Sequence, residues 1–141
     1  MEEREEERVY FHPEGWAIEG GAPVLHGMEC GACGGVYFPA VLRCPRCFGK
    51  DLRERDLSRS GRLYSYSIIH VPPAGFTAPY AVGYVDLPEG VRVFGQLVPD
   101  DFANLRIDME MELVTGVIRR NPDGREVVGY QFRPAAAGPV A

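Results

Sequence analysis

Apolar and polar residues alternate through much of the second half of the chain, in short runs that end at turn-forming residues. Five runs are long enough to be strands, and they span residues 61–71, 81–87, 91–98, 109–119 and 125–133. In the fourth run Met109, Met111 and Leu113 alternate with glutamates, as in a strand with one buried face. The second and third runs are separated by Pro88-Glu89-Gly90, which predicts a hairpin. This half of the chain therefore predicts an all-β domain.

The order of these runs favours one β architecture. A short polar segment with room for one helical turn, residues 100–105, lies between the third and fourth runs. Five strands with a small insertion there match an OB-fold, a partly open Greek-key barrel. Four predicted strands contain an interior glycine where a small barrel must bend: Gly83, Gly95, Gly116 and Gly129. We predict a mostly β protein with a five-stranded OB-fold barrel over residues 56–134 and a tail over 135–141; a β-sandwich of similar strand count is the alternative.

The first 25 residues do not share this pattern. Their Glu/Arg stretch has room for a helical turn or two, but prolines and glycines from Pro13 onward prevent a longer helix. We predict an N-terminal arm over residues 1–25. Its aromatic residues Tyr10, Phe11 and Trp16 favour packing on this chain, with packing on a partner as the alternative.

All the cysteines of the chain lie between these two regions, in two pairs with the spacing C-x2-C-x10-C-x2-C. They are Cys30, Cys33, Cys44 and Cys47. Each pair fits a tight turn that presents two thiolates to one metal ion. Zinc accepts four thiolates tetrahedrally, and a unit this small cannot fold on its own apolar content. We predict a rubredoxin-like ribbon with structural Zn²⁺ over residues 26–55.

Disulfide bonds and an iron site are the alternatives for these cysteines. The absence of an export signal argues against disulfides, and the two cysteine pairs of rubredoxins stand much farther apart in sequence. We expect Gly34 and Gly49, which follow the two pairs, to take the positive φ of such turns. Arg43, Arg46 and Arg53 would offset the negative charge of a zinc tetrathiolate.

Composition and charge argue against nucleic-acid-binding and membrane-spanning functions. The chain has 141 residues, enough for one core and a small appendage. Of its net charge of −5, residues 2–8 contribute −3, from five Glu against two Arg. No basic run marks a nucleic-acid footprint, and no apolar run approaches the roughly 18 residues that cross a bilayer. The acidic first residues do not resemble a signal peptide, so we expect a cytoplasmic protein.

Catalytic residues are not evident. If zinc takes all four thiols, none is left over as a nucleophile. The histidines His12, His26 and His70 do not pair with a serine and an aspartate in a triad pattern, and the sequence contains neither a Walker loop nor a dinucleotide glycine fingerprint. We therefore predict that the chain has no active site of its own.

Several stretches together resemble one known family. They span residues 30–39, 44–47, 61–67, 79–90 and 132–134. Over residues 25–134 the chain resembles the DUF35 family, zinc-ribbon and OB-fold proteins that accompany thiolases and related acyl-CoA enzymes. The resemblance implies an accessory subunit, such as that of benzoylsuccinyl-CoA thiolase or of archaeal acetoacetyl-CoA thiolase complexes. In such a hetero-oligomer a thiolase-fold partner carries the nucleophile and the acyl-CoA site. The resemblance implies that this chain braces the partner and contributes to the CoA site.

Phe76 and Tyr80 are the candidate contacts with CoA or with the partner. They lie in the proline-rich loop 72–80, and two aromatic rings in a stiff loop can pack on adenine or pantetheine; a plain strand connection is the alternative. Many family members begin with one or two helices, whereas here we expect an extended aromatic arm. The alternative function is a module that binds single-stranded nucleic acid, a use of ribbons and OB barrels that the acidic balance opposes.

Overall fold

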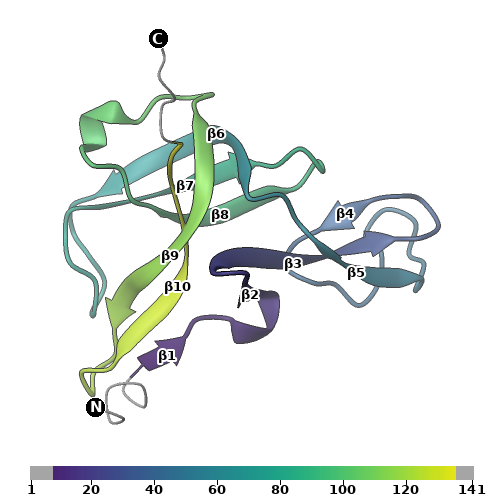
Figure 1. The fold of residues 1–141 in the computed structure, drawn as a ribbon, viewed down its shortest axis with the longest axis horizontal. Coiled ribbons are helices and arrows are strands. Elements are labelled where there is room, and N and C mark those ends of the chain that lie inside the picture. The colour runs from purple at the N-terminus through teal and green to yellow at the C-terminus, as the bar shows by residue number, and fades with distance from the viewer. Residues whose placement is uncertain (1–7, 136–141) are drawn as a thin grey trace.

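The computed structural model describes residues 8–135 (Figure 1). Its strands are β1 (Arg8–Tyr10), β2 (Trp16–Glu19), β3 (Ala22–Cys30), β4 (Val36–Tyr37), β5 (Leu52–Asp56), β6 (Ser60–Ile69), β7 (Tyr80–Asp86), β8 (Arg92–Leu97), β9 (Glu110–Arg120) and β10 (Glu126–Pro134), with 3-10 turns η1 (Pro13–Gly15) and η2 (Phe102–Asn104). Apart from Arg8 and Ala135, the acidic start and the predicted tail lie outside the described residues. No helix within residues 8–135 has the length and apolar character to span a membrane.

Strands β6 to β10 form a closed barrel. The order around it is β6-β7-β8-β10-β9, and β9 pairs again with β6. Strands β8 and β10 are parallel, whereas the other neighbours are antiparallel. The prediction of a mostly β, five-stranded OB-fold is confirmed, and the sandwich alternative is wrong. The observed strands begin and end within two residues of the predicted ones, and η2 lies in the predicted insertion.

The barrel core follows from the alternation in its strands. In β7, Ala81 and Val85 are buried while Tyr84 between them is exposed. Met111 and Phe132 are fully buried on β9 and β10. Gly83 lies where any side chain would collide with the carbonyl oxygen of Ser65 on the neighbouring strand, because the sheet curves tightly there.

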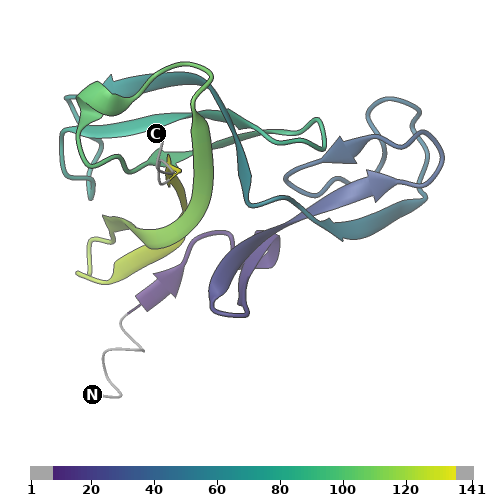
Figure 2. The same ribbon diagram turned by 45° about the horizontal axis from the view of Figure 1, so that its top comes forward.

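The ribbon consists of β3, β4 and β5 and projects to one side of the barrel (Figures 1 and 2). Strand β3 pairs with β2 along its first half and with β4 and β5 along its second half. Since β3 begins at Ala22, it crosses the boundary predicted between residues 25 and 26. The hairpin β2–β3 thus joins the arm to the ribbon without a break.

The described part of the arm packs on this chain. Strand β1 adds to the barrel sheet parallel to β10, with Arg8 opposite Glu126. Trp16 is 4% exposed, and its indole N–H donates to the carbonyl oxygen of Phe11 at 2.6 Å. Tyr10 lies edge-on to Trp16, with ring centroids 6.1 Å apart. The arm is extended, as expected for this chain.

A buried link fixes the ribbon to the barrel. Leu57, which follows β5, belongs to the same apolar core as the barrel residues. The N–H and the hydroxyl of Ser58 both donate to Oε2 of Glu89, at 2.8 and 2.7 Å. Burial of the Glu89 carboxylate raises its pKa, but these hydrogen bonds outweigh burial and the pKa lies below its ordinary value. The link therefore depends on an ionised Glu89.

Candidate metal centre and aromatic groove

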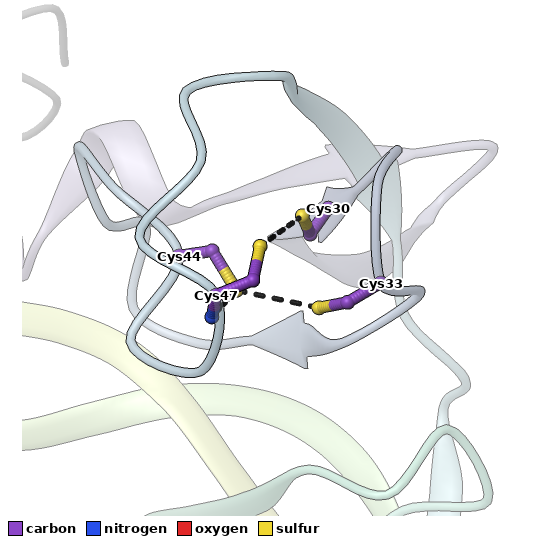
Figure 3. A group of neighbouring side chains, drawn as sticks. All are labelled: Cys30, Cys33, Cys44 and Cys47. Atoms are coloured by element: carbon purple, nitrogen blue, oxygen red, sulfur yellow. Dashed lines mark hydrogen bonds between the residues drawn. The ribbon is translucent and has the colours of Figure 1, made fainter.

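The first cysteine turn is organised around Cys30, at the end of β3. Its N–H donates to the carbonyl oxygen of Gly35 at 2.8 Å, and its own carbonyl oxygen accepts from the N–H of Gly34 at 2.8 Å. Gly34 has φ +80°, which glycine adopts without a steric penalty. Figure 3 shows that the turn brings the side chains of Cys30 and Cys33 toward those of the second pair.

The second turn repeats this pattern around Cys44. Its N–H donates to the carbonyl oxygen of Gly49 at 2.9 Å, and its carbonyl oxygen accepts from the N–H of Phe48 at 2.8 Å. The expectation of a positive φ at Gly49 is wrong, because the left-handed residue here is Phe48, with φ +62°. The turn requires this conformation directly after its second cysteine, where the first turn has Gly34.

The four thiols converge on one point (Figure 3). The sulfurs of Cys30 and Cys47 are 3.6 Å apart, and those of Cys33 and Cys44 are 3.4 Å apart. All four Sγ atoms lie within 4.8 Å of one another. A tetrahedral ion with Zn–S bonds of about 2.3 Å requires S–S separations of about 3.8 Å. The thiols are not linked as disulfides, and their arrangement fits one tetrahedral metal ion.

Hydrogen bonds favour the thiolate form of Cys44. The hydroxyl of Tyr37 lies 3.2 Å from its sulfur, which lowers the pKa of Cys44 to about 6 and raises that of Tyr37 to about 12. The backbone N–H groups of Arg46 and Cys47 also donate to this sulfur, each at 3.4 Å. Sequence reasoning missed Tyr37, since only the fold places β4 beside the second turn.

At Cys47 the surroundings instead favour the protonated thiol. A backbone hydrogen bond at Gly49 favours its thiolate, but hydrogen bonds with Cys30 and Cys44 raise the pKa of Cys47 to about 11. Without a metal ion the pKa values therefore favour the thiolate at Cys44 and the thiol at Cys47. Four cysteine sulfurs this close are the donor set of a structural zinc site.

Phe76 and Tyr80 line an aromatic groove on the outer face of the barrel. Their rings stack with centroids 5.0 Å apart and an interplanar angle of 22°. The groove has a volume of about 390 Å³ and is also lined by the rings of Phe11, Phe94 and Tyr130 and by Arg119. The loop that carries Phe76 is held to β9, since the N–H of Arg120 donates to the carbonyl oxygen of Gly75 at 2.9 Å.

The histidines lie apart from one another. His12 contacts the carboxylate of Glu14 at 3.0 Å, and His26 lies between Asp56 and Glu19, at 3.1 and 3.6 Å. His70 is exposed after β6. Within residues 8–135 no serine hydroxyl is hydrogen-bonded to a histidine.

Comparison with known proteins places both halves of the chain in one family. Residues 21–53 match the rubredoxin-like zinc ribbon domain of ChsH2, and residues 54–116 match its C-terminal OB-fold domain. The chain is 41% identical to the benzoylsuccinyl-CoA thiolase subunit BbsA of Thauera aromatica, over 93% of this chain and 92% of that protein. It is 40% identical to a DUF35 domain-containing scaffold protein of Methanocaldococcus jannaschii, over 78% of this chain and 81% of that protein.

Solved structures agree. A structure of the Ltp2-ChsH2(DUF35) aldolase matches with a TM-score of 0.64 and 31% identity, covering 80% of this chain and 86% of the matched chain. A DUF35 protein of Sulfolobus solfataricus, 18% identical, has the same fold with a TM-score of 0.50, covering 75% of each chain. The chain therefore belongs to the DUF35 family, the zinc-ribbon and OB-fold proteins related to ChsH2.

Proposed function

We propose that this chain is a non-catalytic, zinc-binding accessory subunit of a thiolase or aldolase that acts on an acyl-CoA. The observation that carries this proposal is the 41% identity, over 93% of the chain, to a protein named as a thiolase subunit. The site agrees with it, because all four cysteines of the chain gather in the ribbon and none remains as a nucleophile.

In this proposal Cys30, Cys33, Cys44 and Cys47 together hold one Zn²⁺ ion as a closed tetrathiolate. The convergent sulfurs and the match of residues 21–53 to a zinc ribbon domain support this assignment. Bound zinc supplies folding energy to the ribbon and leaves no open coordination position for a substrate.

The buried link between ribbon and barrel suits a bracing role. The ribbon and the barrel share one core through Leu25 and Leu57, and Glu89 holds the connecting residues. The link holds the ribbon in place relative to the barrel, so a partner could contact both units at once. We propose a hetero-oligomer in which a thiolase-fold subunit supplies the nucleophile and the acyl-CoA site.

We further propose that Phe76 and Tyr80 contact CoA at a site shared with that partner. A groove with five aromatic rings suits a flat adenine or an apolar pantetheine arm, and Arg119 suits a phosphate. In the reconstituted complex, Phe76→Ala and Tyr80→Ala should each raise KM for the acyl-CoA about 10-fold with little change in kcat. Tyr64→Ala, which removes an exposed ring outside the groove, is the matched control. Unchanged KM values in both groove variants would contradict the assignment.

Affinity capture tests the accessory role. The tagged chain is incubated with lysate of its own source at moderate salt, and bound proteins are identified by mass spectrometry; an unrelated tagged OB-fold protein is the control. The proposal expects a thiolase-fold enzyme in stoichiometric amount with the tagged chain and no such enzyme with the control protein. Absence of any acyl-CoA enzyme would contradict it.

A second candidate function is supported by one observation. Tyr64, Tyr84 and Phe94 are 42–50% exposed on β6, β7 and β8, the part of the barrel with which other OB-folds stack nucleic-acid bases. The nearby Arg92 is engaged with Asp86 through bonds of 2.6 and 3.2 Å, so free positive charge is scarce there. Salt-sensitive binding of a fluorescent single-stranded oligonucleotide at micromolar protein would favour this alternative.

A further inference from the structure

Phe48 is held in a strained conformation although most of its side chain is exposed. Its φ is +62°, in the left-handed region that any residue with a Cβ atom avoids. Its side chain is 71% exposed. The first cysteine turn uses Gly34 at the corresponding position, so the turn itself does not require an aromatic ring. Since strained residues in folded proteins concentrate at functional sites, the ring of Phe48 calls for a role outside the isolated chain.

A second apolar side chain is displayed nearby. Leu42 is 94% exposed, the highest value among the exposed large apolar residues described. The guanidinium of the next residue, Arg43, lies 3.5 Å from the carbonyl oxygen of Phe48, which joins the two segments. One exposed leucine is ordinary, but the contact made by the neighbouring Arg43 places two exposed apolar side chains, Leu42 and Phe48, in the same part of the ribbon.

Three cationic residues lie close to Leu42 and Phe48 in the sequence. Arg43, Arg46 and Lys50 are exposed, and within residues 8–135 none of them forms an ion pair with a carboxylate. Other ribbon arginines do form such pairs, for example Arg55 with Glu29 at 2.8 Å. We call Leu42, Arg43, Arg46, Phe48 and Lys50 the ribbon tip. It is cationic although the chain carries a net charge of −5.

We propose that the ribbon tip is a docking surface for the catalytic subunit, in which Phe48 and Leu42 enter an apolar pocket bordered by aspartate and glutamate side chains. The inference rests on the proposed function, because that function supplies the partner. An aromatic anchor with a neighbouring aliphatic side chain and a charged rim is the composition of an interface hot spot. The three cations Arg43, Arg46 and Lys50 exceed the two negative charges of a zinc tetrathiolate by one, which favours an acidic rim on the partner.

The test measures affinity between purified zinc-loaded chain and the thiolase-fold enzyme identified by affinity capture. Phe48→Gly is the decisive variant, because it relieves the backbone strain while it removes the ring. Leu42→Ser cannot disturb the fold at 94% exposure, and Ile107→Ser, 58% exposed beyond η2, is the matched control. Lys50→Glu tests the charge.

We expect Phe48→Gly to raise the ribbon's unfolding midpoint and keep its zinc content, yet weaken binding at least 10-fold. Leu42→Ser should weaken binding 3- to 10-fold, Lys50→Glu should weaken it at low salt, and Ile107→Ser should leave it unchanged. Wild-type affinity in both Phe48→Gly and Leu42→Ser would overturn the docking surface and leave the accessory function standing. If the wild-type chain captures no such enzyme, the proposed function fails, and the docking surface fails with it.

Discussion

The barrel and the ribbon bury different kinds of side chain. The barrel contains large apolar residues at 0% exposure, such as Met111 and Phe132. In the ribbon, β3 buries Val24 and Leu25 near its start, and in the rest of the unit the buried hydrophobic side chains are Cys30 and Cys44. Apolar burial can therefore stabilise the barrel directly, whereas the ribbon depends on its four thiols. With the proposed zinc ion, a single chain would thus combine a unit that folds around its own core with one that folds around a metal ion.

Removal of the metal should have the largest effect on stability, and it should unfold the ribbon while the barrel stays folded. With a chelator, or in Cys44→Ser, the ribbon should lose its folded structure, because binding to structural zinc sites supplies about 10 kcal/mol or more. The barrel should stay folded on its own core. Hydrogen exchange checks this: amides of β4 and β5 should lose protection while those of β7 and β8 keep it. Ser67→Ala, an exposed change on β6, is the control, and a metal-free chain with a protected ribbon would contradict the comparison.

A cavity in the barrel core should have the next largest effect and act on the other unit. Phe132→Ala removes a fully buried ring and should lower the free energy of unfolding by about 3–5 kcal/mol. Urea denaturation followed by tryptophan fluorescence measures this loss. The zinc content below the transition should stay at one ion per chain. Val71→Ala, at an 87% exposed position, is the control.

The link between the units should be sensitive to acid. Glu89→Gln removes the charge that accepts both hydrogen bonds from Ser58 and should cost about 1–2 kcal/mol at neutral pH. Because folding lowers the pKa of Glu89, its contribution is present above the ordinary glutamate pKa and is lost as pH falls through the folded-state value. The free energy of unfolding, measured at pH 7 and at acidic pH, should therefore change less with pH for Glu89→Gln than for the wild type. Glu110→Gln, exposed on β9, is the control; an unchanged difference would contradict the link.

Substitutions in the two cysteine turns should have smaller effects, of opposite sign, on the stability of the ribbon. Phe48→Gly should stabilise the ribbon by about 0.5–1 kcal/mol, and Gly34→Ala should destabilise it by about 1 kcal/mol, because both positions have positive φ. No atom lies within 4 Å of a Cβ built at Gly34, so its penalty comes from the backbone alone. Zinc competition with a chromophoric chelator measures both changes. Shifts of the same sign would contradict the equivalence of the turns.

Local patterns made most of the fold predictable. Alternation and turn residues gave the five barrel strands, and the cysteine spacing named the four residues whose thiols gather in the ribbon. The pairing of β1 with β10 was not predictable, since a three-residue strand has no periodicity and its partner lies more than 100 residues away. Contacts such as Tyr37 with Cys44 likewise arise only when the fold brings two segments together.

The position of Phe48 shows a different limit. The sequence offered a glycine at residue 49, and a preference for glycine in left-handed turns placed the positive φ there. The backbone hydrogen bonds of Cys44 instead require it one residue earlier, so a phenylalanine accepts the strain. Glycine preference alone therefore does not locate a left-handed residue when backbone hydrogen bonds fix which position must adopt that conformation.

The most direct test of the accessory role is reconstitution of activity from separated subunits. The zinc-loaded chain and the captured enzyme are purified apart and assayed alone and together for cleavage of the acyl-CoA, each with and without prior alkylation of its thiols. The account predicts no turnover by this chain alone, full activity from the mixture, and loss of activity when only the partner's thiols are alkylated. Turnover by this chain without a partner would contradict it.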